Sequence, residues 1–179
     1  MIAIMSDDHT RLFGHTQATE RCLQPGEALF IAGDPVQQLA LITLGRVHLL
    51  RRTVEGASVI LQAAGPGDVL AEASVYSARY HCDAEAAQPS IVRLLSVTIF
   101  RKALREDPTL AEAWGAYLAR SVQAARLRAE IRTLRKVSER IDAWLGDGRS
   151  LPEKGQWQDF AAELGVTREA LYRELARRR

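Results

Sequence analysis

The stretch that decides the fold of the C-terminal third is residues 157–175, WQDFAAELGVTREALYREL. Phe160 and Leu164 are four residues apart, so they share one face of a helix, and Gly165 allows the left-handed backbone that ends such a helix. Thr167 is a suitable N-cap for a second helix. This spacing predicts a helix-turn-helix, with helices over residues 157–164 and 167–178.

The second predicted helix has a polar, largely basic outer face. Arginine pairs bidentately with guanine edges, and glutamate accepts a hydrogen bond from cytosine N4. The candidate contacts to double-stranded DNA are therefore the five residues that point away from the buried face: Thr167, Arg168, Glu169, Tyr172 and Arg173. Arg177, Arg178 and Arg179 extend the positive charge toward phosphates. The alternative is an ordinary amphipathic helical hairpin whose polar face contacts only solvent.

The charge distribution supports the DNA hypothesis better than the total charge does. The formal net charge of the 179 residues is only +2. Residues 1–119 carry 10 basic and 13 acidic side chains, whereas residues 120–179 carry 14 basic and 9 acidic ones. A neutral or acidic body joined to a basic C-terminal third is typical of a sensor attached to a nucleic-acid binder.

A long helix is predicted over residues 108–145, since Pro108 starts it and Gly115 is its only glycine. Apolar positions then alternate in steps of four and three through Leu127, Ile131, Leu134, Ser138, Ile141 and Leu145, and an upstream stripe contains Trp114, Leu118, Val122 and Ala125. This is the pattern of a coiled-coil seam, and it predicts a homodimer held by Leu127, Ile131, Leu134 and Ile141. The alternative is packing against the rest of the same chain.

Residues 23–100 are rich in β-formers and in turn signals. Short apolar runs occur at residues 29–31, 39–44, 47–50, 59–61 and 91–95, separated by glycine and proline. Such spacing predicts an antiparallel sandwich or barrel, with Gly56 as a hairpin tip. Because strands precede helices along the chain, the predicted fold class is α+β.

Several other classes are disfavoured. Two cysteines are too few for a disulfide-stapled fold, and no apolar stretch or signal peptide points to a membrane or to secretion, so we expect a cytoplasmic protein. No catalytic or metal-binding motif accompanies the scattered His9, His15, His48 and His81. We therefore expect neither a metal site nor enzymatic activity, although side chains distant in sequence can converge in space.

The order of these parts resembles the CRP/FNR family of bacterial transcription regulators over about residues 20–179. Four segments carry the resemblance: residues 23–34 (LQPGEALFIAGD), residues 44–49 (LGRVHL), residues 65–72 (GPGDVLAE), and Thr167-Arg168-Glu169 with Arg173. The first two are similar to strands of that family's β-roll. The third resembles the entry to its effector pocket, and the last resembles its recognition helix.

The resemblance implies an N-terminal extension over residues 1–20 and a jelly-roll-like, cyclic-nucleotide-binding-like effector domain over residues 21–107. A dimerisation helix over residues 108–145 and a helix-turn-helix segment over residues 146–179 would follow. The implied partners are double-stranded DNA, a second copy of the chain, RNA polymerase and a small-molecule effector of unknown identity. The family's β-hairpin wing has no counterpart before Arg179, whether naturally or because the record is truncated, so we expect weaker DNA binding and a more mobile C-terminus. Glu174, where the family has an apolar residue, suggests a loosened packing surface.

The candidate effector residues are Ala71, Glu72, His81 and Cys82. Family members that bind cyclic nucleotides hold the phosphate with a Gly-Glu pair followed by Arg-Ser or Arg-Thr. Here Ala71 precedes Glu72, and His81-Cys82 stands at the Arg-Ser place. A phosphodiester without an arginine partner is poorly satisfied, so we expect an effector other than cyclic AMP and no bound cofactor.

Three alternatives stay open at this point. His81 and Cys82 are candidate haem ligands, although neighbours on a strand point to opposite faces. Cys82 is also a candidate redox thiol, whereas Cys22 and Cys82 alone cannot hold the four-cysteine cluster of the family's oxygen sensors. Finally, the chain could be a sensing or protein-interaction module with weak or no DNA binding.

Overall fold

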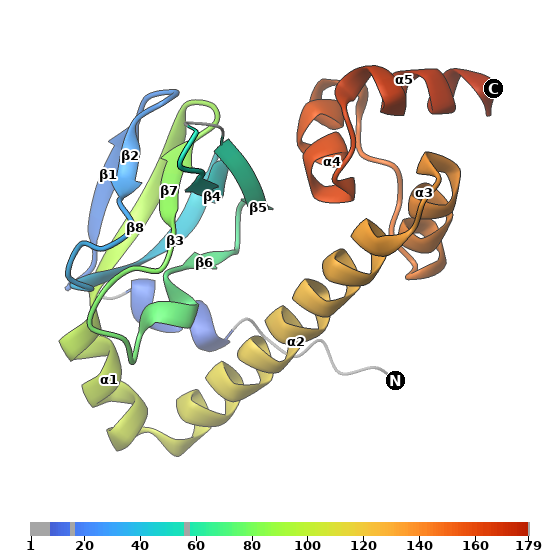
Figure 1. Cartoon of the computed structure of the whole chain (residues 1–179). Helices are drawn as coiled ribbons and strands as arrows, with labels where there is room; N and C mark the ends of the chain where they lie inside the picture. Colours follow the sequence, from blue (N-terminus) through green and yellow to red (C-terminus); the bar gives the residue numbers. More distant parts are fainter. Residues whose placement is uncertain (1–7, 15–16, 56–57, 179) are drawn as a thin grey trace. The chain divides into compact units, whose positions relative to one another are not determined.

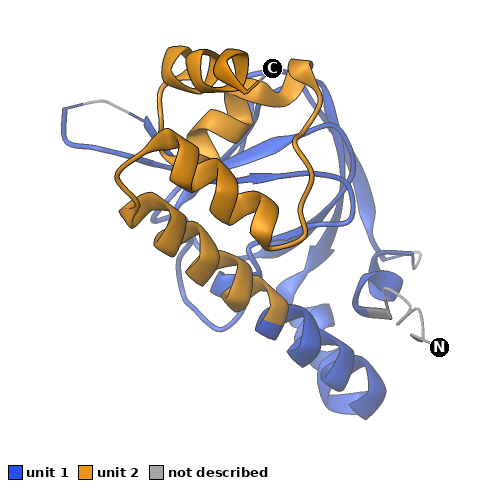
Figure 2. Ribbon diagram, turned by 90° about the vertical axis from the view of Figure 1, so that its right-hand side faces the viewer, with its two compact units in different colours: residues 1–119 blue, residues 120–179 orange. Residues whose placement is uncertain are grey.

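The structure is a computed structural model that describes residues 8–14, 17–55 and 58–178. The chain divides into two compact units, residues 1–119 and 120–179, which are described separately below (Figure 2). Gly56, the predicted hairpin tip, lies outside the described residues.

The first unit contains two four-stranded antiparallel sheets (Figure 1). The first sheet has the order β1 (Thr19–Leu23), β8 (Ser90–Ser96), β3 (Gln38–Leu44) and β6 (Val69–Leu70). The second has the order β2 (Ala28–Phe30), β7 (Asp83–Ala86), β4 (Val47–Arg52) and β5 (Ser58–Ala64). The predicted α+β class and antiparallel β-roll are confirmed.

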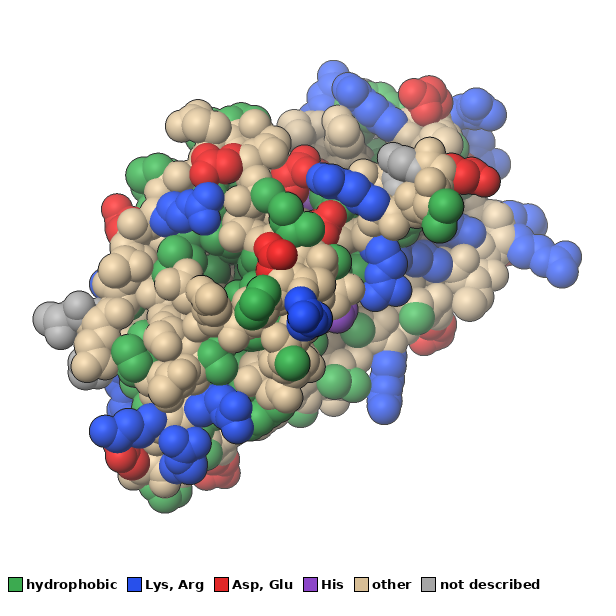
Figure 3. Space-filling view, turned by 60° about the vertical axis from the view of Figure 1, so that its left-hand side comes forward, with side chains coloured by type: hydrophobic (Ala, Val, Ile, Leu, Met, Phe, Trp, Pro, Cys, Tyr) green, Lys and Arg blue, Asp and Glu red, His purple; other side chains and the backbone are tan. Residues whose placement is uncertain are grey.

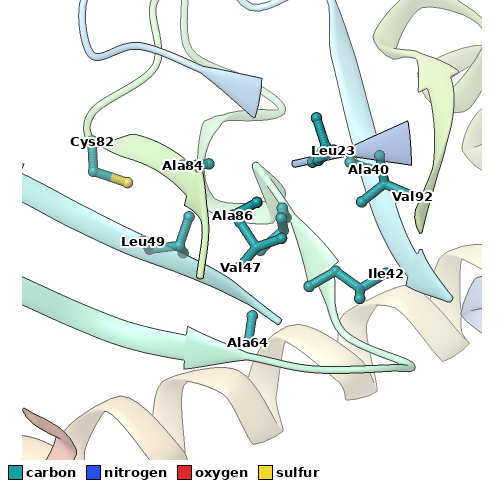
Figure 4. Packing of buried hydrophobic residues seen from close by; sticks show 11 residues of the cluster. Leu23, Ala40, Ile42, Val47, Leu49, Ala64, Cys82, Ala84, Ala86 and Val92 are labelled. Atoms are coloured by element: carbon teal, nitrogen blue, oxygen red, sulfur yellow. The ribbon is translucent and has the colours of Figure 1, made fainter. Parts of the chain in front are cut away.

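A hydrophobic core lies between these sheets. Its fully buried members, eleven side chains in all, come from both sheets and from Cys82, and ten of them are labelled in Figure 4: Leu23, Ala40, Ile42, Val47, Leu49, Ala64, Cys82, Ala84, Ala86 and Val92. Alanine is frequent among them, which lets the two sheets approach closely. Burial of this apolar surface is the main stabilising term for the roll.

Helices cover a second core in the same unit. The 3-10 helix η1 (Asp8–Gly14), helix α1 (Val97–Glu106) and the first turns of α2 (Pro108–Thr133) supply Phe13, Phe100 and Trp114 to it. Phe100 meets Trp114 edge-on at 4.7 Å between ring centroids. The Tyr117 hydroxyl contacts both Val69 N (3.0 Å) and Val69 O (3.2 Å), which fastens α2 to β6.

The second unit comprises the end of α2, then α3 (Val137–Gly146), the 3-10 helix η3 (Lys154–Gln156), α4 (Trp157–Leu164) and α5 (Arg168–Arg177). Its core is formed by seven buried side chains: Ile131, Ile141, Phe160, Ala161, Leu164, Leu171 and Leu175. The helix-turn-helix predicted from Phe160, Leu164 and Gly165 is confirmed as α4, a short turn and α5.

The single helix predicted over residues 108–145 is wrong, because it breaks after Thr133 and restarts at Val137. Two side chains stabilise the break. Glu139 accepts a hydrogen bond from the backbone N–H of Lys136 at 3.1 Å and so caps the start of α3. Arg140 reaches back to the carbonyls of Leu134 (2.8 Å) and Arg132 (3.1 Å) at the end of α2.

Candidate functional site

The turn between α4 and α5 has the geometry that its sequence predicts. Gly165 adopts φ 65° and ψ 39°, the left-handed conformation that terminates α4. The N–H of Val166 donates to the carbonyl of Ala161 at 2.9 Å, which closes the turn. The Thr167 hydroxyl then accepts from the N–H of Ala170 at 3.2 Å and caps α5.

This turn fixes which residues of α5 face outward. Leu171 and Leu175 are buried against the core of the second unit. The five predicted DNA contacts lie together on the remaining face, at the start and middle of α5: Thr167, Arg168, Glu169, Tyr172 and Arg173. The Tyr172 ring is held edge-on against Trp157 at 4.8 Å between ring centroids. Arg168 donates to the Tyr172 hydroxyl at 3.3 Å, and its guanidinium lies 5.1 Å from the ring centroid.

Two charged groups on this face are available to a ligand. The backbone N–H of Glu169 itself and the Thr167 hydroxyl hold the pKa of the exposed Glu169 carboxyl below its usual range, so it is an acceptor at neutral pH. Arg173 is exposed, and its guanidinium has no ion pair among the described residues.

A basic pocket of about 480 Å³ adjoins this face, and the sequence analysis missed it. It is lined from the start of α3 and from α5 by Arg135, Lys136, Val137, Ser138, Ala170, Arg173, Glu174 and Arg177. Four of these eight residues are basic, and Glu174 is the only acid. The basic pair Arg135-Lys136 was visible in the sequence, but the unbroken helix predicted there gave it no place beside α5.

The expectations for the end of α5 need correction. Glu174 does not loosen the packing: its side chain is only 12% exposed and pairs with both Arg177 and Arg178 at 3.0 Å. These two guanidiniums hold the pKa of Glu174 below its usual range. Arg178 also donates to Asp142 (2.7 Å) and to the Ser138 carbonyl (2.8 Å), so it braces α5 to α3. Arg179 lies outside the described residues.

The predicted dimer residues differ in their surroundings. Ile131 and Ile141 are almost completely buried in the core of the second unit, so their assignment to a dimer seam is wrong. The physical reason is the break before Val137, which turns α3 back to pack with α4 and α5. Leu127 is half-buried against the same core, and Leu134 is half-buried at the break.

The effector residues lie on one segment but do not all face the same way. Ala71 is buried with φ 67°, a left-handed conformation that disfavours any side chain and suits the glycine of the family pattern. It precedes the 3-10 helix η2 (Glu72–Ser74), which places Glu72 half-buried. His81 is exposed, and its Nδ1 lies 3.0 Å from the Ser74 hydroxyl.

One cation that the sequence analysis missed reaches this segment. Arg51, at the end of β4, donates to the carbonyl of His81 at 3.2 Å. The family pattern has its phosphate-binding arginine at the position of His81, and Arg51 brings a guanidinium to this residue from a different strand, β4. Arg79 instead donates to the carbonyl of Gly33.

Cys82 points away from His81 into the β-roll core and is 1% exposed. Burial, followed by the negative charge of Glu72, raises the pKa of Cys82 to about 11. The thiol is therefore almost entirely protonated at neutral pH, which argues against a redox-reactive role.

Labelling tests this conclusion. We expect the aromatic disulfide DTNB to modify the exposed Cys22 rapidly at pH 8 and Cys82 only after urea unfolds the chain, because the thiolate is the reactive form. Cys22→Ala is the matched control and should abolish the fast phase. A fast phase that survives in Cys22→Ala would show that Cys82 is reactive.

No group of three or more potential metal ligands occurs within residues 8–14, 17–55 and 58–178. Over the same residues, no helix combines the length and the apolar character needed to cross a bilayer. The second unit exposes the polar face of α5, and the first unit has a polar segment that contains Glu72 and His81.

Comparison with known proteins identifies the architecture. Residues 20–107 match the model of the cyclic nucleotide-binding domain. The chain is also 26% identical over 162 residues to the cyclic AMP receptor protein of Thermus thermophilus, covering 87% of this chain and 75% of that protein. The chain is therefore similar to a cyclic nucleotide-binding domain over residues 20–107 and to a CRP-type protein over most of its length.

Two solved structures share the fold. FixK2 from Bradyrhizobium japonicum superposes with a TM-score of 0.75 at 24% identity, over 89% of this chain and 83% of that one. CLP of Xanthomonas campestris, described as a c-di-GMP-responsive global regulator, superposes with a TM-score of 0.69 at 20% identity, over 95% and 89% of the two chains. Of these relatives, CLP is described as a regulator and the Thermus thermophilus protein as a receptor.

Proposed function

We propose that this chain is a homodimeric transcription regulator that binds double-stranded DNA through α5 and responds to a small-molecule effector other than cyclic AMP. The observation that carries the proposal is the outer face of α5, where a capped helix presents Arg168, Glu169 and Arg173 beside a basic pocket. We assign it to the cytoplasm, with RNA polymerase as a further partner, because the family consists of transcription regulators.

The roles of the α5 residues follow from their chemistry. Arg173 forms no ion pair within the part of the chain that the structure describes, and it is the best candidate for a bidentate contact to guanine O6 and N7. The ionised Glu169 suits the N4 amino group of cytosine. Arg135 and Lys136, in the break just before α3, suit phosphate oxygens, which position a protein on the duplex without reading its sequence.

Arg173→Ala is expected to weaken binding to a specific duplex by about 1–3 kcal/mol and to relax base preference at one position of each half-site. Fluorescence anisotropy on a duplex selected from a random pool measures both effects. Lys136→Ala should instead weaken specific and scrambled duplexes alike and make the salt dependence shallower, because a phosphate contact carries no sequence information.

Arg120→Ala is the matched control. Arg120 is an exposed arginine on α2, more than three helical turns before that helix ends at Thr133, and it lines neither α5 nor the basic pocket. This variant should leave both affinities unchanged. If Arg173→Ala and Arg120→Ala behave alike on the selected duplex, α5 does not read DNA, and a module acting through protein contacts becomes the better description.

The dimer proposal now rests on the upstream part of the predicted apolar stripe on α2, because Ile131 and Ile141 are buried in the core of the second unit. Val122, Ala125 and Ala129 recur in steps of three and four, and all three are exposed, Val122 at 49%. Apolar residues at this spacing form a seam that a second helix can cover. A two-fold dimer would also present two copies of α5 to successive major grooves.

The effector proposal rests on the segment after β6. The relative from Thermus thermophilus is named a cyclic AMP receptor protein, but this chain has Ala71 and His81-Cys82 where the family pattern has Gly and Arg-Ser. Cys82 is turned into the core and cannot contact a ligand there. Arg51, the guanidinium that reaches this segment, donates to the His81 carbonyl.

Isothermal titration calorimetry tests this prediction. We expect no saturable heat when cyclic AMP is titrated up to about 1 mM, which corresponds to a binding free energy weaker than about 4 kcal/mol. The Thermus thermophilus relative serves as the positive control. A saturable micromolar isotherm for this chain would contradict the proposal.

A further inference from the structure

A second pocket in the first unit lies apart from the effector segment. Its volume is about 410 Å³, within the range of small-molecule sites. It is lined by Tyr76, Arg101, Leu104, Arg105, Ala111, Trp114, Gly115 and Leu118, from α1, the first half of α2 and the loop after η2. None of the four predicted effector residues lines it.

One wall of this pocket is apolar and rigid. Trp114 is only 3% exposed, and Phe100 holds its ring edge-on from behind. Leu104 and Leu118 continue the wall, and both pack against the same core. A Cβ atom placed on Gly115 would meet no atom within 4 Å, so the pocket is empty next to this residue.

The charged side chains of this pocket are all positive. Arg101 and Arg105 are one helical turn apart on α1, and neither forms an ion pair within residues 8–14, 17–55 and 58–178. Their neighbour Lys102 does have a partner, Glu106, at 3.9 Å. The Arg101 guanidinium lies over the Tyr76 ring, 5.1 Å from its centroid. Figure 3 shows Lys and Arg side chains, with acidic ones among them, at the lower end of the face that it draws.

Two unpaired like charges at positions i and i+4 destabilise a helix slightly, and an anion placed between them removes that cost. A guanidinium also binds carboxylate or sulfonate oxygens through two parallel hydrogen bonds.

We propose that this pocket binds a small organic anion. Its aromatic or aliphatic body would lie on Trp114, Leu104 and Leu118, and its anionic group would lie against Arg101 and Arg105. The proposal does not depend on DNA binding or on the identity of the effector at residues 71–82.

A pair of fluorescent probes tests the proposal on the full chain. The probe 8-anilinonaphthalene-1-sulfonate carries the anionic group, and N-phenyl-1-naphthylamine has the same rings without it. We expect Arg101→Gln combined with Arg105→Gln to weaken sulfonate binding about ten-fold or more, because charge-assisted hydrogen bonds are lost, and to leave binding of the neutral probe unchanged. Gly115→Leu fills the pocket and should weaken both probes.

Lys102→Gln is the matched control on the same helix and should change neither affinity. Thermal unfolding by circular dichroism confirms that each variant is folded, and the exposed arginine pair keeps the test valid if Gly115→Leu does not fold. If the double variant binds the sulfonate probe as tightly as the unchanged chain does, the probe is an adventitious additive only, and the proposal is overturned. Arginine variants that alter the oligomeric state but not probe affinity would assign the pocket to a second copy and would also overturn it.

Discussion

Gly45→Ala is expected to destabilise the β-roll by about 3–5 kcal/mol, which is large for the addition of one methyl group. Gly45 connects β3 to β4 with φ 89°, a conformation that costs an alanine roughly 1–2 kcal/mol. A Cβ atom there would also lie 2.6 Å from the Cα of Ser90, and closer still to the Ser90 hydroxyl and the Pro89 carbonyl. The backbone of the neighbouring turn would have to move.

That movement would break a small hydrogen-bond network. The Ser90 hydroxyl lies 2.9 Å from the N–H of Arg46 and 3.1 Å from its carbonyl, and it also contacts the carbonyl of Gln88 at 2.8 Å. Because Ser90 is buried, groups that lose these partners would be left unsatisfied.

Urea unfolding of both proteins measures the loss. Gly67→Ala is the matched control, since Gly67 has φ 91° but a Cβ atom there meets nothing within 4 Å. Gly67→Ala should lower the free energy of unfolding by about 1–2 kcal/mol, which is the cost of placing an alanine in the left-handed conformation. If Gly45→Ala and Gly67→Ala lose the same free energy of unfolding, the close approach to Ser90 does not contribute to the destabilisation.

Arg140→Ala is expected to destabilise the second unit by about 3 kcal/mol, because one guanidinium caps two helices. Besides the Leu134 and Arg132 carbonyls of α2, Arg140 donates to the Leu164 and Gly165 carbonyls at the end of α4, each at 2.8 Å. Without it, carbonyl groups at both helix ends lose a charged donor.

The measurement is urea unfolding followed through the fluorescence of Trp144 and Trp157, which both pack in the core of the second unit. Arg140→Lys should recover only part of the loss, because an ammonium group lacks the planar fork that spans the carbonyls. Arg126→Ala, an exposed position on α2, should be nearly neutral. A neutral Arg140→Ala variant would show that the break between α2 and α3 is stabilised elsewhere.

Much of the architecture could be predicted from the sequence. The α4–turn–α5 arrangement followed from Phe160, Leu164, Gly165 and Thr167, because a left-handed terminator and an N-cap are local signals. The strands β1, β6 and β7 were missed, because β7 (Asp83–Ala86) and β1 (Thr19–Leu23) lack apolar runs and β6 has only two residues. Tertiary pairing, rather than propensity, forms them.

The break in the long helix could not be predicted from periodicity. Residues 134–136 contain neither glycine nor proline, and the stripe through Ile131 and Ile141 continues across them. Arg140 contacts the end of α4, and these long-range hydrogen bonds exist only in the folded unit. For the same reason the basic pocket beside α5 and the approach of Arg51 to His81 were invisible in the sequence.

Selection of duplexes from a random pool of about 30 base pairs, using the full chain at low salt, tests DNA recognition by α5 most directly. We expect enrichment of a pseudopalindrome whose half-sites are about 10 base pairs apart, centre to centre, and an affinity that falls steeply as salt rises. Arg173→Ala should lose the enriched base at one position of each half-site. A pool that shows no enrichment, or enrichment that is identical for Arg173→Ala, would contradict the assignment of α5 as a DNA-reading helix.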